Sequence, residues 1–160
     1  NNILMSARQV PELTKKRVQV IASDSPAQGV AALLAFNFEA DFETNTAAME
    51  EAIGHIDTAE ITRAVRTAQV DGLAVSEGDI IGLINGKVRS VGSDMQEVVR
   101  DALTRMGVER HEIITVYYGE GVTGVAANEL AQQIKGWFAE QEIEVINGGQ
   151  PYYAYIISAE

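Results

Sequence analysis

The sequence contains no cysteine, and its 160 residues include one tryptophan and three prolines. A chain without cysteine has no disulfide, no thiolate metal ligand and no thiol nucleophile. Long hydrophobic runs are missing too, since no segment approaches the roughly 18–20 apolar residues needed to cross a bilayer. The sequence therefore predicts a protein without a membrane span, and a cytoplasmic location is the expectation that fits.

Basic residues are scarce: 12 Lys and Arg stand against 23 Asp and Glu, which gives a net charge of −11. The one basic run, Lys15 to Arg17, is too short to follow a phosphate backbone, so no nucleic-acid partner is predicted. The acidity has two interpretations. It can attract a basic partner surface and speed docking, or it can simply maintain solubility.

Hydrophobic residues make up 46% of the chain and charged residues 22%, as in an ordinary globular protein. Residues 1–57 are interpreted as the end of a partial α/β subdomain. In this part, Ser25 is placed to cap a buried helix and Pro26 to begin it. The predicted elements are a helix over 2–9, the helix that begins at Pro26 and contains the apolar run 30–36, a helix over about 44–55, and a strand over 17–21.

Residues 58–160 are interpreted as a second lobe. Asn85-Gly86 suits the positive-φ positions of a type I′ turn and predicts a hairpin, and Asp94 is placed to cap an amphipathic helix. The predicted strands are 79–84, 87–91, 112–118, 143–146 and 152–157, with helices over 95–106 and 125–140 and either one strand over 60–75 or two broken at Asp71-Gly72. Strands that begin as a hairpin and then alternate with helices indicate an α/β fold, a layered mixed sheet with packed helices.

Gly119 to Gly124 matches the G-x-G-x-x-G pattern between a predicted strand and a predicted helix. This is the context in which a dinucleotide phosphate binds at a helix N-terminus, and Glu144 lies where a ribose-binding acid is expected. However, Glu120 would place a negative charge beside the pyrophosphate, and residues 125–160 are too few to complete a nucleotide-binding half. A flexible strand-to-helix loop is the favoured interpretation.

A second special segment joins paired glycines to three tyrosines. Its candidate contact residues are Gly148, Gly149, Gln150, Pro151, Tyr152, Tyr153 and Tyr155. In the predicted strand, Tyr153 and Tyr155 share one face and Tyr152 lies on the other. Exposed tyrosines beside a shaped loop are typical of contact surfaces, whereas buried ones would be core or edge-strand aromatics. The sequence leaves both interpretations open.

The loop from Ser23 to Gly29 supplies the other candidate binding residues, which are Ser23, Ser25, Gln28 and Gly29. One hypothesis places this loop opposite the Gly148–Pro151 loop across a cleft, where main-chain amides could hold a carboxylate or a phosphate. No nucleophile elbow, phosphate-loop lysine, paired acids or metal-ligand spacing around His55 and His111 is found. No catalytic or metal residue is therefore predicted.

Several segments together resemble one family, the C-terminal part of fatty acid kinase catalytic subunits, whose members are also described as dihydroxyacetone-kinase-like or DAK-phosphatase-domain proteins. The segments are residues 2–7, 23–36, 78–87, 118–120 and 148–158. One departure is that Ala27 separates Pro26 from Gln28, where the family is expected to have proline directly before the Gln-Gly pair.

The resemblance implies a DegV-like lobe and a docking role. In that family an N-terminal domain binds ATP and magnesium, a middle domain follows, and the C-terminal region engages a DegV-type protein that carries a fatty acid. The kinase and middle domains have no counterpart here, so the chain is expected to be a fragment, with no cofactor and no enzyme activity of its own. Its implied partners are the carrier and the remainder of the kinase protein. The alternative is a small-ligand domain for fatty acid or phosphate, or a phosphatase.

Overall fold

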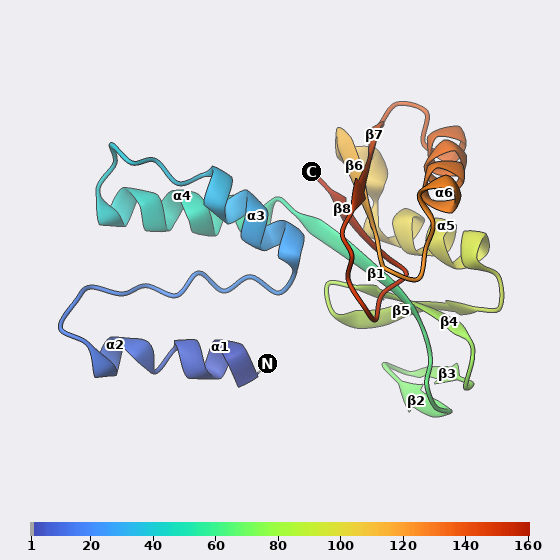
Figure 1. Cartoon of the computed structure of the whole chain (residues 1–160), viewed down its shortest axis with the longest axis horizontal. Helices are drawn as coiled ribbons and strands as arrows, with labels where there is room; N and C mark the ends of the chain where they lie inside the picture. The colour runs from blue at the N-terminus through green and yellow to red at the C-terminus, as the bar shows by residue number, and fades with distance from the viewer. Residues whose placement is uncertain (1) are drawn as a thin grey trace. The chain divides into compact units, whose positions relative to one another are not determined.

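The computed structural model describes residues 2–160 and divides into two compact units, one that ends at Ile56 and one that begins at Asp57 (Figure 1). Each unit has an architecture of its own. Among the described residues, no helix is both long and apolar enough to cross a membrane.

The first unit is helical throughout its regular structure. Its helices are α1 (Asn2–Ala7), α2 (Val10–Leu13), α3 (Pro26–Leu34) and α4 (Phe42–Gly54). The predicted cap is confirmed: Ser25 Oγ accepts a hydrogen bond of 3.2 Å from the Gln28 amide, and Pro26 opens the helix. The strand predicted over 17–21 is wrong, since residues 2–56 include no strand. Alternating side chains favour a strand only where a neighbouring strand can pair with it.

A buried asparagine organises the connection between α3 and α4. The side-chain amide of Asn45 donates to the carbonyl oxygens of Asn37, Ala40 and Asp41 over 2.9–3.1 Å. Its Oδ1 accepts from the Asn37 amide at 2.7 Å. One side chain thus contacts four main-chain groups of the loop, of which the carbonyls of Asn37 and Asp41 also accept from backbone amides.

Helix α3 is less buried than its composition predicts. Ala27 and Ala32 are its buried residues, whereas Leu33 and Leu34 are 71% and 81% exposed. The prediction of a buried helix is therefore wrong for the leucine side. An apolar run does not determine which side of a helix is covered, and among the residues that the structure describes this helix buries alanines.

The second unit is a mixed α/β lobe, so the predicted fold class is confirmed. Its strands are β1 (Asp57–Arg63), β2 (Ala68–Val70), β3 (Leu73–Val75), β4 (Ile80–Ile84), β5 (Lys87–Gly92), β6 (Ile113–Tyr118), β7 (Glu142–Asn147) and β8 (Tyr155–Ala159), with helices α5 (Met95–Met106) and α6 (Gly124–Trp137) and the short 3-10 helix η1 (Val108–Arg110). Six strands form one sheet in the order β5-β4-β1-β8-β6-β7, and β2 and β3 form a separate hairpin. Strands β6 and β7 are parallel, and the other sheet neighbours are antiparallel.

Two tight turns have the backbone that their residues predict. Asn85 and Gly86 have φ of +48° and +76°, which confirms the type I′ hairpin between β4 and β5. Asp71 and Gly72, with φ of +52° and +84°, turn β2 into β3 in the same way. The segment 60–75 is thus the end of β1 followed by a short hairpin.

Helices α5 and α6 cover one face of the sheet and share a single core with it (Figure 1). Asp94 caps α5 as predicted, by accepting from the Glu97 amide at 2.9 Å. The helix lies close to the sheet because β4 has a glycine beneath it: a Cβ on Gly82 would lie 3.2 Å from the Cβ of Ala102. Gly82 therefore lies on the face of the sheet that α5 covers, and the side chains next to it on β4 point to the opposite face.

The β2–β3 hairpin lies against that other face. Ile81 and Leu83 alternate with Gly82 and so point away from α5. The hairpin turn is tied to the sheet by Asp71, whose Oδ2 accepts from the Val88 amide at 2.8 Å. Val75 and Val88 are buried on this side. The hairpin and the sheet face together form the walls of the site described next.

Candidate functional site

The loop between β7 and β8 is anchored on the end of β6. The amides of Gly148 and Gly149 both donate to the Tyr118 carbonyl, over 3.0 and 3.2 Å. The Gln150 side-chain amide donates to the Tyr117 carbonyl at 2.9 Å. Gly149 has a φ of +62°, a left-handed conformation that suits glycine. These two glycine amides already have acceptors inside the protein, so in this arrangement they are not available to hold an anion.

Gly119, the first glycine of the G-x-G-x-x-G pattern, is packed against the same loop. A Cβ at this position would overlap the carbonyl oxygens of Tyr153 and Gln150. The Gly119 amide donates to Ala154 at 2.9 Å, and the Glu120 amide donates to Gln150 at 3.2 Å. The motif is thus a strand-to-helix loop occupied by the chain's own backbone, which disfavours a dinucleotide there.

The prediction that Tyr153 and Tyr155 share one face of a strand, with Tyr152 on the other, is wrong. Strand β8 begins at Tyr155, so Tyr152 and Tyr153 lie in the loop, where strand alternation does not apply. Tyr155 is 5% exposed in the helix-covered core, and its burial, together with the charge of Glu129, raises the pKa of its phenol. Tyr152 and Tyr153 instead line a pocket on the other side of the sheet. Tyr155 is therefore a core residue, and the two preceding tyrosines are the accessible ones.

The pocket has a volume of about 370 Å³ and lies between the sheet and the β2–β3 hairpin. Ile81 and Leu83 of β4 form its floor, and Val70 and Val75 come from the hairpin. Its other lining residues are Thr62, Arg63, Ala64, Val65, Arg66, Ala68, Val88, Tyr152 and Tyr153. Sequence reasoning selected its two tyrosines but not its apolar floor, because strand pairing determines which residues come together there.

Tyr152 is the most exposed aromatic side chain of this rim, at 83%. Its main chain is held by β1, since Thr62 Oγ1 donates to the Tyr152 carbonyl at 2.6 Å. Val65, 86% exposed, lines the same pocket. The β7–β8 loop thus presents a tyrosine, and the β1–β2 connection a valine, to solvent beside an apolar pocket.

A half-buried acid lies on this face of the sheet. Glu60 of β1 pairs with Leu83 on one side and with Ile156 on the other. Burial between these apolar neighbours raises the pKa of its carboxyl. Burial and the charge of Glu60 also raise the pKa of the Tyr153 phenol.

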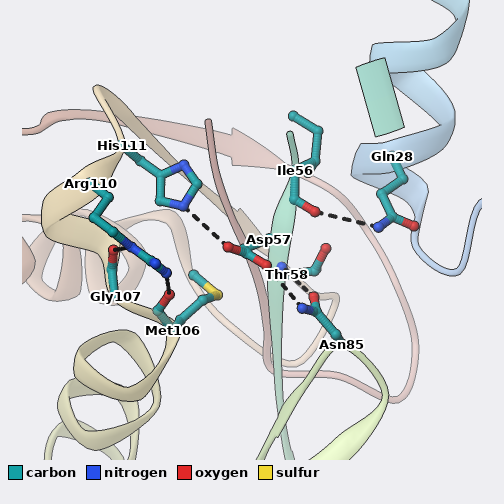
Figure 2. Close-up of polar contacts among 9 residues, drawn as sticks. All are labelled: Gln28, Ile56, Asp57, Thr58, Asn85, Met106, Gly107, Arg110 and His111. Carbon is teal, nitrogen blue, oxygen red and sulfur yellow. Dashed lines mark hydrogen bonds and ion pairs between the residues drawn. The ribbon is translucent and has the colours of Figure 1, made fainter. Parts of the chain in front are cut away.

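The predicted residues of the Ser23–Gly29 loop belong to the first unit and are held by internal hydrogen bonds. Gln28 Oε1 accepts from the Asp24 amide at 2.8 Å, and its Nε2 donates to the Ile56 carbonyl at 3.4 Å (Figure 2). The Gly29 amide donates to the Ser25 carbonyl, and Ser23 Oγ lies beside Gly29. Gln28 therefore fastens the helix start to the end of its own unit.

Sequence reasoning missed a polar cluster at the start of β1. His111 Nε2 lies 3.2 Å from Asp57 Oδ2, and Asn85 Nδ2 donates to Asp57 Oδ1 at 2.9 Å (Figure 2). Asn85 Oδ1 in turn accepts from the Thr58 amide at 3.0 Å. His111 and Asp57 are 54 positions apart, so no local sequence pattern predicts the pair. The cluster joins β1, the hairpin turn and the end of η1.

The same region closes the C-terminal end of α5. Arg110 donates to the carbonyl oxygens of Met106 and Gly107 over 3.3 and 3.4 Å (Figure 2). Within residues 2–160, no group of three or more His, Asp or Glu side chains is placed to hold a metal ion.

Comparisons with known proteins give this chain a family context. The family model for the C-terminal region of FakA-like fatty acid kinase subunits matches residues 1–160. Protein YloV of Bacillus subtilis (strain 168) is 35% identical over 160 residues, and the chain spans 29% of its length.

The fold is similar to that of DegV family proteins. One from Thermus thermophilus, described as binding fatty acid, superposes with a TM-score of 0.63 at 14% identity, over 98% of this chain and 66% of that one. The DegV family protein Cg2579 from Corynebacterium glutamicum gives 0.63 at 12% identity, over 98% and 69%. At these identities the similarity concerns the fold alone, and it confirms the predicted DegV-like architecture.

Proposed function

The chain belongs to the FakA-like C-terminal family of fatty acid kinase proteins, and on that premise we propose that it is a docking region for a fatty-acid carrier. It binds a DegV-type protein loaded with a fatty acid and positions the acyl carboxylate for phosphorylation. The ATP and magnesium needed for that step are bound by another part of the longer protein. The family match over the whole chain is the observation that carries this proposal.

The length of the chain relative to Protein YloV supports a docking role that is separate from nucleotide binding. The chain spans 29% of the length of Protein YloV, so the longer protein has ample room for a separate nucleotide domain. Docking contributes to such a reaction by holding two reactants in a productive geometry. On this view the chain alone hydrolyses no ATP and transfers no phosphate.

The pocket rim carries exposed side chains on a main chain that is held in place. Tyr152 is a large amphipathic side chain on a loop held by Thr62, so binding would cost little ordering of the main chain. Val65 adds apolar area beside it. We assign this rim as the centre of the carrier contact.

Charge supports association with a basic carrier surface. The net charge of −11 gives long-range attraction to such a surface and raises the rate of encounter. Salt screens this attraction, so docking should weaken as ionic strength rises.

The proposal is tested by comparing two variants in a binding titration with the fatty-acid-loaded carrier. Tyr152→Ala should weaken binding by about 2 kcal/mol, as expected for an aromatic hot spot. Val125→Ala, at a 71% exposed site on α6, is the matched control and should leave affinity unchanged. If Tyr152→Ala bound the carrier as tightly as Val125→Ala, the rim would not be part of the interface.

A further inference from the structure

Strand β7 is an open edge of the six-stranded sheet. It pairs with β6 on one side, and among the described residues no strand pairs with its other side. The opposite edge, β5, is partly closed, because Asp71 of the β2–β3 hairpin accepts a hydrogen bond from the Val88 amide at 2.8 Å. The pairing of β7 with β6 keeps one register over six residues, and β7 contains no proline. A regular edge of this kind is a template for another strand.

The main chain of β7 alternates between β6 and the open side. The amides of Glu142 and Gly148 donate to carbonyls on the β6 side, over 2.8 and 3.0 Å. Because successive residues of a strand direct their main-chain groups to opposite sides, the even-numbered positions of β7 face β6. The amides and carbonyls of Ile143 and Val145 therefore point to the open side, where an incoming strand can pair with them.

A groove of about 580 Å³ lies along the same edge, between β7 and α6. Ile143 and Val145 are half-buried against the core, and they line the groove together with Ala131 of α6. In strand addition the main-chain hydrogen bonds supply affinity, and contacts for alternate side chains supply specificity. The groove offers such contacts to apolar side chains on the α6 side of an added strand.

The charges on this edge are acidic and unpaired. Glu140 and Glu142 line the groove, and Glu144 is exposed on β7. None of the three is in an ion pair with a residue among 2–160. The basic residue of the lining is Lys135, whose ammonium group donates to two carbonyls of the α6–β7 connection, each at 2.8 Å. The edge therefore attracts a strand that carries Lys or Arg.

A second copy of the chain is a poorer occupant of this edge. Pairing β7 with itself would bring two copies of Glu142 and Glu144 into one short ladder, where like charges repel. The same carboxylates favour a strand of opposite charge, so they select between the two kinds of partner. Since Glu142 and Glu144 alternate with Ile143 and Val145, the complementary strand alternates basic and apolar residues.

We propose that β7 binds an extended basic segment of a partner protein by strand addition, with its apolar side chains at the α6 groove and its Lys or Arg beside Glu142 and Glu144. This surface uses other residues than the Tyr152 rim, and the inference does not rest on carrier docking. The two can fail independently, because the experiment below uses a synthetic peptide and no carrier.

The probe is a peptide, blocked at both ends, that alternates lysine and valine over roughly nine residues, longer than the strand it is to pair with. It is titrated into the whole chain and followed by calorimetry and amide hydrogen exchange. Saturable binding should slow exchange of the Ile143 and Val145 amides, whereas the Glu144 amide, which faces β6, should change little. A peptide that alternates glutamate and valine should bind about tenfold more weakly or worse.

Two N-methylated versions of the lysine–valine peptide test whether a ladder forms. One carries methyl groups on its lysine amides and the other on its valine amides. Each version therefore lacks the donors of one strand edge while its side chains are unchanged. The version methylated on the edge that faces β7 should lose binding, and the other should retain it.

A pair of charge variants locates the contact. Glu144→Lys should weaken binding of the lysine–valine peptide by about fivefold or more, since it replaces an attractive charge by a repulsive one. Glu77→Lys makes the same charge change at an exposed position between β3 and β4, and it should have little effect. Circular dichroism and melting curves check that each variant is folded.

The proposal is overturned if the folded chain gives no saturable binding, or if the slowed amides lie outside β7. It is also overturned if the two N-methylated peptides bind alike, or if Glu144→Lys and Glu77→Lys bind the peptide equally. A dimer of the chain alone in which the Ile143 and Val145 amides are already protected would overturn it too, because the edge would then belong to a second copy.

Discussion

The Thr62 hydroxyl donates a hydrogen bond of 2.6 Å to the carbonyl oxygen of Tyr152, so that strand β1 holds the loop that carries the exposed tyrosine. The bond joins residues 90 positions apart. It links the sheet to the surface assigned to carrier docking.

Thr62→Val removes this bond while keeping the side-chain shape. It should lower the free energy of unfolding by about 1 kcal/mol and weaken carrier binding, because the loop is less ordered before docking. Thr104→Val is the matched control, since Thr104 Oγ1 donates to the Arg100 carbonyl within α5, away from the loop. The control should lose similar stability with no loss of carrier affinity. Equal carrier affinity in both variants would contradict the role given to Thr62.

Gly119→Ala should destabilise the second unit, because the added methyl group overlaps two carbonyl oxygens of the β7–β8 loop. The expected loss is about 1–3 kcal/mol in chemical unfolding, typical of overpacking. Gly121→Ala in the same motif is the control, since a Cβ there meets no atom within 4 Å. If both alanines were neutral, the close approach at Gly119 would be refuted.

Glu60 makes stability depend on pH. Burial raises its folded pKa above the ordinary value of 4.5, so the unfolded chain releases this proton first as pH rises. Its contribution to folding therefore becomes less favourable from about pH 4.5 upward, until the folded carboxyl has also ionised. Glu60→Gln should be more stable than the parent at neutral pH, and this gain should shrink as pH falls through the raised folded pKa toward 4.5 and be largely lost below it.

Unfolding curves of Glu60→Gln at several pH values measure that gain. Glu144→Gln, at an exposed position on β7, controls for the loss of one negative charge. A gain that does not vary with pH would show that burial of the Glu60 charge is not its cause.

Asn45→Asp should destabilise the first unit. The substitution keeps the size of the side chain but places an oxygen where the amide now donates to three carbonyls. The expected cost is about 1–3 kcal/mol, since the Ala40 carbonyl loses the Asn45 donor and a carboxylate oxygen now faces three carbonyl oxygens. Hydrogen exchange should accelerate in α3 and α4, and an unchanged exchange rate there would contradict the role of Asn45.

Local chemistry predicted much of the second unit. Asn85-Gly86 specified a turn by its φ preference, and Asp94 specified a helix start by its cap, so both elements follow from neighbouring residues. The strand expected over 17–21 failed because a strand depends on a partner that local sequence does not supply. Leu34 is exposed for a similar reason, since apolar composition does not say which side of a helix is covered.

The candidate site was predictable only in part. The glycine and tyrosine segment was recognisable by composition, and Tyr152 and Tyr153 do line a pocket. Tyr155 was misplaced because the strand begins three residues later than predicted. The pocket floor at Leu83 and the pair of His111 with Asp57 depend on contacts between distant segments, which spacing along the chain does not reveal.

The most direct test of the docking role is a calorimetric titration of the folded chain with a fatty-acid-loaded DegV-type carrier from the same organism, at low and at high salt. The account predicts a saturable complex that weakens as salt rises, with no ATP hydrolysis by the chain alone. A chain shown to be folded that gives neither heat of binding nor a complex on size exclusion would contradict the account.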